Sequence, residues 1–458
     1  MRFESEIELL SRAQEAEGMS FYEIDRTGRI DNEKAKGHLG QVIEESFFGY
    51  EVNSNAEADF AELGIELKVT PVKELKNGQL SAKERLVLNI IDFHKEALNS
   101  FEDSSFWRKN ESLLLMFYKW LPDIPRGDYR ILKSHLHRFS ESDLQVIRND
   151  WSIIVAKIKA GQAHLISEGD TAYLGACTKG ANRKSIRTQP FSHEPAMQRA
   201  FSLKASYMTT LIRELITAEH LVPIAEPDEL QQKSLGQLLS DRFKKYEGMA
   251  IEDIAKEADA PLNTKSKSFL PLFVSSLLGV KGTSLEDIEE FSKANIKFKT
   301  VRLEPDGKPK EHMSFHTINF QEWINEEWET SLLRTMFEET KYLLVVFGYQ
   351  ETLRENPDRN LYFKGVHLWN MPMEEIEGRL KDFWLEGRAI LEEGVLLKKT
   401  NRGISNNLPD PQSNGLCHVR PRARNAGDRI ILPDGQPITK QAFWIDREYI
   451  GEITKELK

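Results

Sequence analysis

The chain has 458 residues, of which 40% are apolar and 29% are charged, and its formal net charge is -10. This apolar fraction suffices for packed cores and the length suggests about two or three domains, so a disordered or fibrous protein is excluded. Two cysteines exclude a disulfide scaffold and a four-thiolate zinc site. The acidic N-terminus does not resemble a signal peptide, and the longest mostly apolar stretch, 269–280, is too short to span a bilayer. We therefore expect a soluble protein of the reducing bacterial cytoplasm.

The first half of the chain predicts alternating helices and strands. We expect helices over 36–50, 140–161 and 200–214, and strands over 65–72, 86–91, 112–118 and 171–175. The helix over 140–161 has the clearest signals, because Ser140 can cap its first turn and Gly161 ends its apolar stripe. The strand over 65–72 is expected to end at Pro71, which cannot donate to a ladder.

The second half repeats the first. Prolines and acids around 221–228 predict a linker, which gives a first domain of residues 1–220, a linker of 221–229 and a second domain of 230–458. Four segments recur in the same order. Leu39-Gly40-Gln41 with Phe47 and Tyr50 matches Leu235-Gly236-Gln237 with Phe243 and Tyr246. Residues 60–68 match 291–299, residues 112–117 match 342–347, and Ala200-Phe201 with Tyr207 matches Ala442-Phe443 with Tyr449. One domain type therefore occurs twice, with 398–415 as a loop inside the second copy.

The chemistry-bearing residues of the first copy gather in the run ADFAELGIELK. Glu66 and Lys68 are two apart on an expected strand, so their side chains leave the same face while Leu67 points into the core. Asp59 precedes a turn at Gly64 that leads into this strand, which would place its carboxylate beside Glu66. Two adjacent carboxylates repel unless a cation lies between them, and hard oxygen ligands favour Mg²⁺. Such an ion can activate water and neutralise charge at phosphorus, which indicates phosphodiester hydrolysis; a surface ion pair on an exposed strand face is the alternative.

The two copies differ at these positions. In the first copy, Glu44 adds a third acid on the preceding helix face. The second copy carries Ser240 for Glu44, Glu290 for Asp59, Lys297 for Glu66 and Lys299 for Lys68. This contrast is typical of one catalytic copy and one copy without a full catalytic set.

Several runs carry a family resemblance. KGHLGQVIEESFFGY followed by ADFAELGIELKVTPV resembles the start of the MutH mismatch-repair nicking endonuclease and of the related GATC-cutting type II restriction endonucleases. ISEGDTAYLGACTKGAN and RAFSLKASYMT resemble the C-terminal part of that family, and SAKERLVLNII resembles its restriction-enzyme branch. The resemblance covers most of residues 30–215. It implies an α/β PD-(D/E)xK fold, with a restriction-endonuclease-like central mixed sheet flanked by helices, together with Mg²⁺ dependence and duplex DNA containing GATC as substrate. In the restriction branch it also implies a second MutH-like domain that binds DNA and regulates cleavage.

The resemblance assigns roles to residues of the first copy. The expected catalytic set is Asp59 and Glu66 as metal ligands, Lys68 as the lysine of the motif and Glu44 as an auxiliary helix acid. Lys36 matches another family lysine without an assigned role. A further family lysine falls near Lys109 or Glu111 by spacing, and the sequence alone leaves both open.

Two basic loops are the expected DNA-binding surfaces, although a solvated surface is the alternative for either loop alone. The expected DNA-binding residues are Lys179, Asn182, Arg183, Ser202 and Lys204 in the first copy and Arg420, Arg422 and Asn425 in the second. A lysine or arginine at Lys179 or Arg422 can donate to guanine, and the asparagines three residues later either read adenine or serve only turn geometry. The family places a methylation-sensing tyrosine where this chain has Ser202, so we expect cleavage to tolerate N6-methyladenine.

Three functions are compatible with these patterns. The first is a restriction endonuclease whose second copy binds another site, the second is a catalytically silent DNA-binding protein, and the third is a nicking repair enzyme. The intact Asp59, Glu66 and Lys68 favour the first, and the fused second copy argues against the third. A palindromic site needs two cuts, so we expect a homodimer on DNA with strongly salt-dependent binding. His135 and His137 have a weak metal-ligand spacing and are expected to be surface residues.

Overall fold

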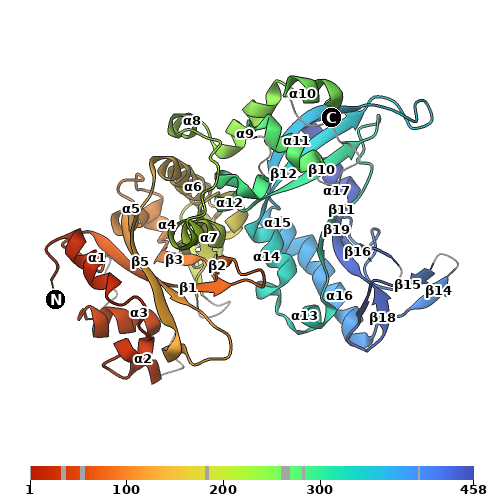
Figure 1. Ribbon diagram of the computed structural model, residues 1–458. Helices are drawn as coiled ribbons and strands as arrows, with labels where there is room; N and C mark the ends of the chain where they lie inside the picture. Colours follow the sequence, from red (N-terminus) through yellow and green to blue (C-terminus); the bar gives the residue numbers. More distant parts are fainter. Residues whose placement is uncertain are drawn as a thin grey trace. The chain divides into compact units, whose positions relative to one another are not determined.

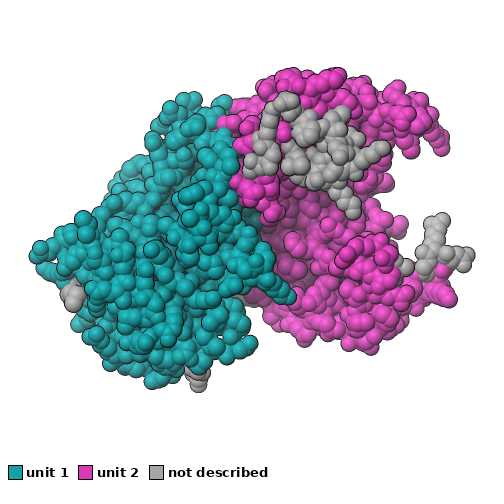
Figure 2. All heavy atoms as spheres, in the orientation of Figure 1, with its two compact units in different colours: residues 1–234, 289–295 teal, residues 235–288, 296–458 magenta. Residues whose placement is uncertain are grey.

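The computed structural model describes residues 2–31, 38–51, 57–180, 185–258, 269–280, 284–400, 403–425 and 427–457 (Figure 1). They form two compact units, coloured separately in Figure 2: unit 1 comprises residues 1–234 with 289–295, and unit 2 comprises 235–288 with 296–458. The expected linker 221–229 lies within unit 1, so the change of unit after Ser234 comes later than the sequence suggested. Within the described part of the chain, no helix combines the length and apolarity needed to cross a bilayer.

Unit 1 is built on a mixed sheet of order β2-β1-β4-β5, in which β1 and β4 are parallel and the other pairs are antiparallel. Its strands are β1 (Ile65–Glu74), β2 (Leu80–Ala82), β4 (Ser112–Lys119) and β5 (Arg130–Arg138). A smaller antiparallel sheet contains β3 (Leu86–Ile90), β9 (Arg199–Leu203) and β6 (Leu174–Thr178), and a hairpin joins β7 (Ile186–Gln189) to β8 (Ser192–Met197).

Helices of unit 1 flank these sheets. They are α1 (Glu6–Gln14), α2 (Phe21–Ile24), α3 (His38–Val42), α4 (Phe93–Glu96), α5 (Ser105–Asn110), α6 (Glu141–Lys159), α7 (Ala205–Ile212), α8 (Pro227–Gln232) and α12 (Glu289–Lys293). One apolar core lies between the N-terminal helices and the main sheet, where Leu67 and Leu114 pack with Phe47, Phe48 and Phe60. This core fixes the start of β1 against the helical segment that follows α3.

Unit 2 repeats this plan. Its sheets are β10 (Ile296–Leu303), β12 (Lys341–Tyr349) and β13 (Leu361–Trp369), and β11 (Met313–Thr317), β19 (Gln441–Ile445) and β16 (Cys417–Pro421). Two hairpins pair β14 (Lys398–Thr400) with β15 (Gly403–Ser405) and β17 (Arg429–Ile431) with β18 (Pro437–Thr439). The helices are α9 (Leu235–Lys244), α10 (Ile251–Glu257), α11 (Phe269–Leu277), α13 (Phe320–Asn325), α14 (Leu332–Glu339), α15 (Met373–Glu375), α16 (Lys381–Glu393) and α17 (Arg447–Ile453).

The topology confirms the predicted α/β fold and its duplication. The parallel pair β1–β4 with antiparallel β5 recurs as β10–β12–β13, and β3–β9–β6 recurs as β11–β19–β16. Ile65 lies opposite Ser112 and Ile296 lies opposite Lys341. Ser112 therefore corresponds to Lys341, one residue away from the match with Tyr342 that the sequence suggested.

Several predicted elements need correction. The strands over 86–91 and 112–118 and the helix over 140–161 are confirmed, and Ser140 Oγ accepts the Asp143 N–H at 3.1 Å. The strand that contains Pro71 does not end there but continues to Glu74. Pro71 takes part in the pairing with the end of β2 through its carbonyl, which accepts the Lys83 N–H, so the backbone N–H that proline lacks is not required at this position. The strand expected over 171–175 begins at Leu174, and residues 200–203 are strand rather than helix because β9 is buried between β3 and β6. The loop expected over 398–415 contains the β14–β15 hairpin.

Candidate active site

The turn before β1 brings Asp59 to the start of that strand. Phe60 and Ile65 form a bridge across the turn, and Gly64 adopts a φ of 67°, a conformation that glycine tolerates best. The Asp59 N–H donates to Glu66 Oε2 at 3.3 Å, and Asp59 Oδ2 accepts the Leu67 N–H at 3.0 Å. These two bonds hold the Asp59 and Glu66 carboxyl groups side by side.

Two lysines from different elements approach Glu66. Lys68, on the same face of β1, has its Nζ 2.6 Å from Glu66 Oε1. Lys109, on α5, has its Nζ 3.5 Å from the same oxygen. Glu66 itself is 3% exposed. Of the two positions that spacing alone left open, Lys109 approaches Glu66, whereas Glu111 is an exposed residue at the end of α5.

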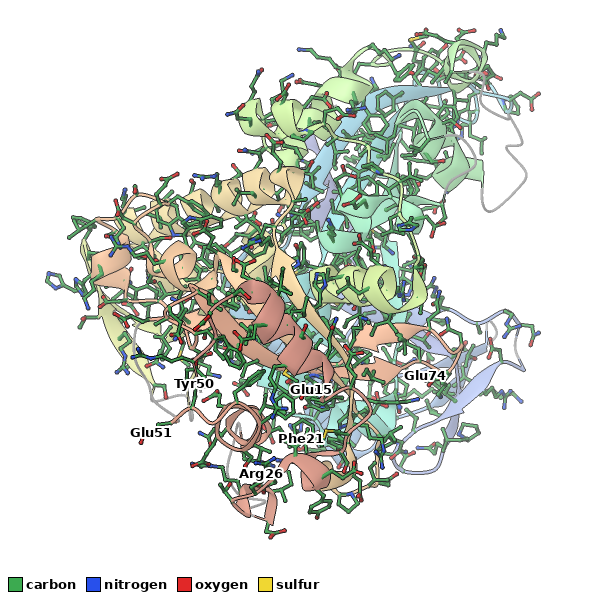
Figure 3. The ribbon with its side chains drawn as sticks, turned by 60° about the vertical axis from the view of Figure 1, so that its left-hand side comes forward. Glu15, Phe21, Arg26, Tyr50, Glu51 and Glu74 are labelled. Atoms are coloured by element: carbon green, nitrogen blue, oxygen red, sulfur yellow. The ribbon has the colours of Figure 1, made fainter. Side chains whose placement is uncertain are left out.

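Glu44 lies in the π-helical turn Ile43–Phe47 that continues α3, and π-turns are frequent at functional sites. Burial, together with the negative charge of Asp59, raises the pKa of Glu44 to about 7. Burial also raises the pKa of Glu66, while the Lys68 charge lowers it. Tyr50, after the Glu44 turn, lies well away from Glu74 at the far end of β1 (Figure 3). Glu44 interacts electrostatically with both Asp59 and Glu66, so the three acids gather at the start of β1.

This donor set fits a hard dication. The carboxylates of Asp59, Glu66 and Glu44 offer oxygen lone pairs beyond those that accept the hydrogen bonds described above. Oxygen ligands of this kind suit Mg²⁺, and a dication relieves the repulsion that raises the pKa of Glu44.

The matching positions of the second copy serve other purposes. Within unit 1, the Glu290 carboxylate accepts the Ile224 and Ala225 N–H groups at 2.9–3.1 Å. Within unit 2, the Lys297 side chain is 50% exposed beside Glu286, and Lys299 Nζ donates to Ser314 O at 2.6 Å. Burial lowers the pKa of Lys299 to about 8, with Arg422 adding to the effect. Ser240 is exposed.

The expected DNA-binding residues of the first copy fall into three groups. Lys179 is exposed after β6, and its N–H donates to Gln198 O at 2.8 Å. Asn182 and Arg183, like Lys36, lie outside the described residues. Ser202 and Lys204 are buried.

The burial of Ser202 and Lys204 corrects the expectation that they contact DNA. Ser202 Oγ donates to Glu168 Oε1 at 3.4 Å, and Lys204 Nζ donates to Thr171 O at 2.6 Å. A side chain that is enclosed in the smaller sheet and engaged with the protein has no surface to offer a DNA backbone.

The basic loop of the second copy is exposed. Arg420 lies 5.7 Å from the centre of the Trp444 ring, and Arg422 donates to Phe315 O. Asn425 Oδ1 accepts the Gly427 N–H at 2.9 Å, the turn role that the sequence left open. Because Cys177 pairs with Ala200 and Arg420 pairs with Ala442, the registers place Lys179 and Arg422 at corresponding positions.

Sequence reasoning missed a charge pair inside the smaller sheet of unit 1. Arg85 contacts Glu168 at 2.8 Å, and Glu168 is 2% exposed. A Cβ atom at Gly175 would lie 2.5 Å from Glu168 Oε2, so only glycine leaves space for this carboxylate. Glu168 and Gly175 stand in the ISEGDTAYLGACTKGAN run, whereas the distant Arg85 carries no local signal.

The two histidines of β5 also differ from expectation. His137 is buried, so its prediction as a surface residue was wrong, and His135 is partly exposed. Burial lowers the pKa of His137 to about 3. Its Nε2 lies 3.4 Å from the Tyr207 hydroxyl, which places it in a buried polar cluster of unit 1.

Comparison with known proteins places this geometry in a family. The family described as DNA mismatch repair enzyme MutH matches residues 48–150 and 279–382, once in each copy. The chain is 36% identical to the type II restriction enzyme Sau3AI of Staphylococcus aureus, over 98% of both chains. It is 31% identical to the DNA mismatch repair protein MutH of Shewanella woodyi, over 45% of this chain and 90% of that protein. The MutH protein of Pasteurella multocida is 29% identical over 40% of this chain and 82% of its own length.

Proposed function

The chain belongs to the MutH-related family of type II restriction enzymes, and we propose that it is a Mg²⁺-dependent endonuclease that cuts duplex DNA at GATC sites. The observation that carries this proposal is the cluster at the start of β1, where Asp59, Glu66 and Glu44 meet Lys68 and Lys109. Similarity to a restriction enzyme over 98% of the chain favours this function over that of a nicking repair enzyme.

The residues of the cluster have distinct roles in the proposed reaction. A Mg²⁺ ion held by Asp59 and Glu66 would supply Lewis-acid stabilisation of the charge that develops at phosphorus. Glu44, whose pKa of about 7 lies near neutrality, can accept a proton from a nucleophilic water. Lys68 holds the Glu66 carboxylate by a 2.6 Å hydrogen bond and offers its remaining N–H groups to the water or to a phosphate oxygen.

The proposal extends to DNA recognition. Exposed Lys179 in unit 1, with Asn182 and Arg183 beyond it, and exposed Arg420 and Arg422 in unit 2 supply cations for phosphates and guanine edges. Unit 2 binds DNA as a tethering or allosteric site. The enzyme acts in the bacterial cytoplasm, and two chains assemble on one palindromic site.

Tolerance of N6-methyladenine is the finer part of the proposal. Position 202 carries a serine whose hydroxyl is turned to Glu168, so no bulky side chain projects from this position toward an adenine. We expect equal digestion of methylated and unmethylated GATC plasmids by equal amounts of enzyme. Strong protection by methylation would contradict it.

The test of the main proposal is digestion of a GATC-containing duplex, with and without Mg²⁺, by the parent chain and by Glu66→Ala. We expect double-strand cleavage only by the parent chain with Mg²⁺, and no cleavage of a matched duplex that carries GTAC instead. Binding without cleavage by the parent chain would indicate the silent DNA-binding protein. Accumulation of nicked product alone would indicate the nicking enzyme.

A further inference from the structure

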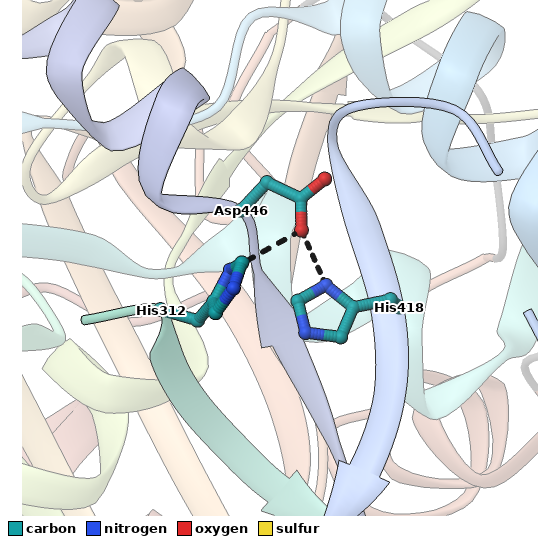
Figure 4. Close-up of side chains that lie close together, drawn as sticks. All are labelled: His312, His418 and Asp446. Carbon is teal, nitrogen blue, oxygen red and sulfur yellow. Dashed lines mark ion pairs between the residues drawn. The ribbon is translucent and has the colours of Figure 1, made fainter. Parts of the chain in front are cut away.

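Three potential metal ligands meet at one end of the smaller sheet of unit 2 (Figure 4). His312 directly precedes β11, His418 lies in β16, and Asp446 directly follows β19, the strand between them. Asp446 Oδ1 contacts His418 Nδ1 and lies 3.4 Å from His312 Nδ1. One potential ligand atom from each residue lies within 4.8 Å of the other two.

The two innermost members are buried and contact each other. His418 is 0% exposed and Asp446 is 2% exposed. Within the described part of the chain, Asp446 Oδ1 contacts only the two histidine rings, and His418 Nε2 has no hydrogen-bond partner. Buried polar atoms are almost always satisfied, and a metal ion satisfies imidazole nitrogens and carboxylate oxygens together.

The duplication shows that this cluster is specific to unit 2. Leu203 of β9 pairs with Leu174 and Leu86, and Ile445 of β19 pairs with Cys417 and Met313. The registers then give three pairs of corresponding positions: Arg85 with His312, Gly175 with His418, and Lys204 with Asp446.

Unit 1 fills the corresponding space differently. There Arg85 pairs with the Glu168 carboxylate, which lies where a side chain at Gly175 would project. In unit 2 the position of Gly175 is taken by His418, that of Arg85 by His312, and that of Lys204 by Asp446. A charge pair in one copy therefore corresponds to three ligand-type side chains in the other.

We propose that His312, His418 and Asp446 bind one divalent transition-metal ion, with zinc as the physiological occupant. Two imidazoles and one carboxylate suit Zn²⁺, whereas Mg²⁺ prefers oxygen ligands alone. Zinc–ligand bonds of about 2.0–2.1 Å in tetrahedral geometry separate ligand atoms by roughly 3.3 Å, close to the His312–Asp446 spacing of 3.4 Å. The His418–Asp446 contact is shorter than this, so ligation through these two atoms requires them to move apart. His312 Nδ1 also accepts the Arg447 N–H at 3.2 Å; ligation through Nδ1 displaces that bond and ligation through Nε2 keeps it.

The ion would join three segments that are distant in sequence. It would link the start of β11, the middle of β16 and the junction between β19 and α17. Because β16 carries Arg420 and leads to Arg422, the ion would hold the base of the basic loop. Its role is structural, and it is distinct from the proposed Mg²⁺ site of unit 1.

The test measures metal content and affinity in the full chain. Chelator-treated protein is dialysed against zinc, its bound zinc is measured by elemental analysis, and visible absorption is recorded after Co²⁺ loading. We expect one zinc per chain, Co²⁺ bands of a site with fewer than six ligands, and no displacement by excess Mg²⁺. A ratio well below one, or zinc that Mg²⁺ displaces, would overturn the proposal.

Variants separate ligation from folding. Asp446→Asn keeps the shape of the side chain, and His312→Ala removes the more accessible imidazole, so both remain informative if the fully buried His418 tolerates no change. We expect each to weaken zinc binding at least about tenfold while the circular dichroism of the chain is unchanged. His367→Ala, outside the cluster in unit 2, and Glu66→Gln in unit 1 should bind zinc like the parent chain. Parental zinc affinity in both Asp446→Asn and His312→Ala would refute the site.

Discussion

Glu66 shows how a single buried carboxylate depends on its neighbours. A carboxylate that is 3% exposed loses most of its hydration, and burial raises its pKa. Lys68 and Lys109 compensate for part of this loss from two different elements. The same arrangement serves the proposed catalysis, because each lysine also holds the Glu66 carboxylate where it could bind a metal ion.

Lys109 is the residue whose role the structure makes testable. Lys109→Ala removes a cation 3.5 Å from Glu66, so we expect the single-turnover cleavage rate to fall on the order of 100-fold with little loss of DNA affinity. Lys95→Ala, which removes an exposed lysine in the preceding helix, serves as the matched control. A parental cleavage rate in Lys109→Ala would remove this lysine from the mechanism.

Glu44 predicts a pH dependence of stability. Its folded pKa of about 7 exceeds the ordinary value of 4.5, so its contribution to stability is present below pH 4.5 and is lost as the pH rises through 7. Glu44→Gln should therefore raise the melting temperature without Mg²⁺ at pH 8 by on the order of a few degrees, and much less at pH 5. The measurement is thermal unfolding at both pH values; an equal shift at both would contradict the assigned pKa.

At the scale of elements, the sequence predicted the site better than it predicted the element ends. Period-two spacing placed Glu66 and Lys68 on one face of β1, and the turn at Gly64 correctly suggested that Asp59 returns to them. Two local signals gave wrong element ends. Pro71 did not end its strand, because it pairs through its carbonyl at the end of β2. Residues 200–203 were predicted as helix but form a strand, because burial between two neighbouring strands overrides local helix propensity. Lys109 needed the tertiary fold, since 30 residues, 75–104, separate α5 from β1.

Helix α12 joins unit 1 through a contact that sequence could not reveal. Lys293 Nζ lies 2.7 Å from Asp143 Oδ1 on α6, and the Tyr207 hydroxyl donates to Asp143 Oδ2 at 2.9 Å. Both charged side chains are less than 10% exposed. The pair couples residues 150 positions apart and makes unit 1 dependent on a segment beyond Ser234.

Breaking this ion pair should destabilise unit 1. Lys293→Met leaves the buried Asp143 charge without its cation, and the expected loss in the free energy of unfolding is about 3–5 kcal/mol. The double variant Asp143→Asn with Lys293→Met removes both charges and keeps an acceptor for Tyr207, so it should regain part of that loss. Urea unfolding of the full chain measures both; a single variant as stable as the parent would show that the pair contributes nothing.

At the scale of the whole molecule, the two copies share a fold but differ at the positions of the acid cluster. Both copies keep the mixed sheet and the smaller sheet, but of the two sets of corresponding positions only that of the first copy brings Asp59 and Glu66 together. In the second copy, Glu290 accepts backbone N–H groups, Lys299 donates to a backbone carbonyl, and Lys297 is half exposed to solvent. The similarity to a type II restriction enzyme extends along 98% of the chain and therefore includes both units.

One complete acid set per chain predicts the stoichiometry on DNA. Because a palindromic site has two scissile bonds, we expect two chains on one GATC duplex in Ca²⁺, measured by analytical ultracentrifugation. Binding should weaken steeply with salt. Arg420 and Arg424 are exposed arginines of the basic loop in unit 2, and replacing both with alanine should reduce the slope of log K against log salt by about 2. A single chain per duplex during complete double-strand cleavage would contradict the dimer.

We propose that hydrolysis takes place at the start of β1 in unit 1. The most direct test of this proposal is the single-turnover cleavage rate of a one-site GATC duplex by the parent chain, Glu66→Gln and Glu290→Gln, with DNA affinity measured in Ca²⁺. Glu290→Gln changes the corresponding acid of the second copy and keeps an acceptor oxygen. We predict a loss of at least about 1,000-fold for Glu66→Gln with near-parental affinity, and a near-parental rate for Glu290→Gln. Cleavage by Glu66→Gln at the parental rate, or loss of cleavage only in Glu290→Gln, would contradict the account.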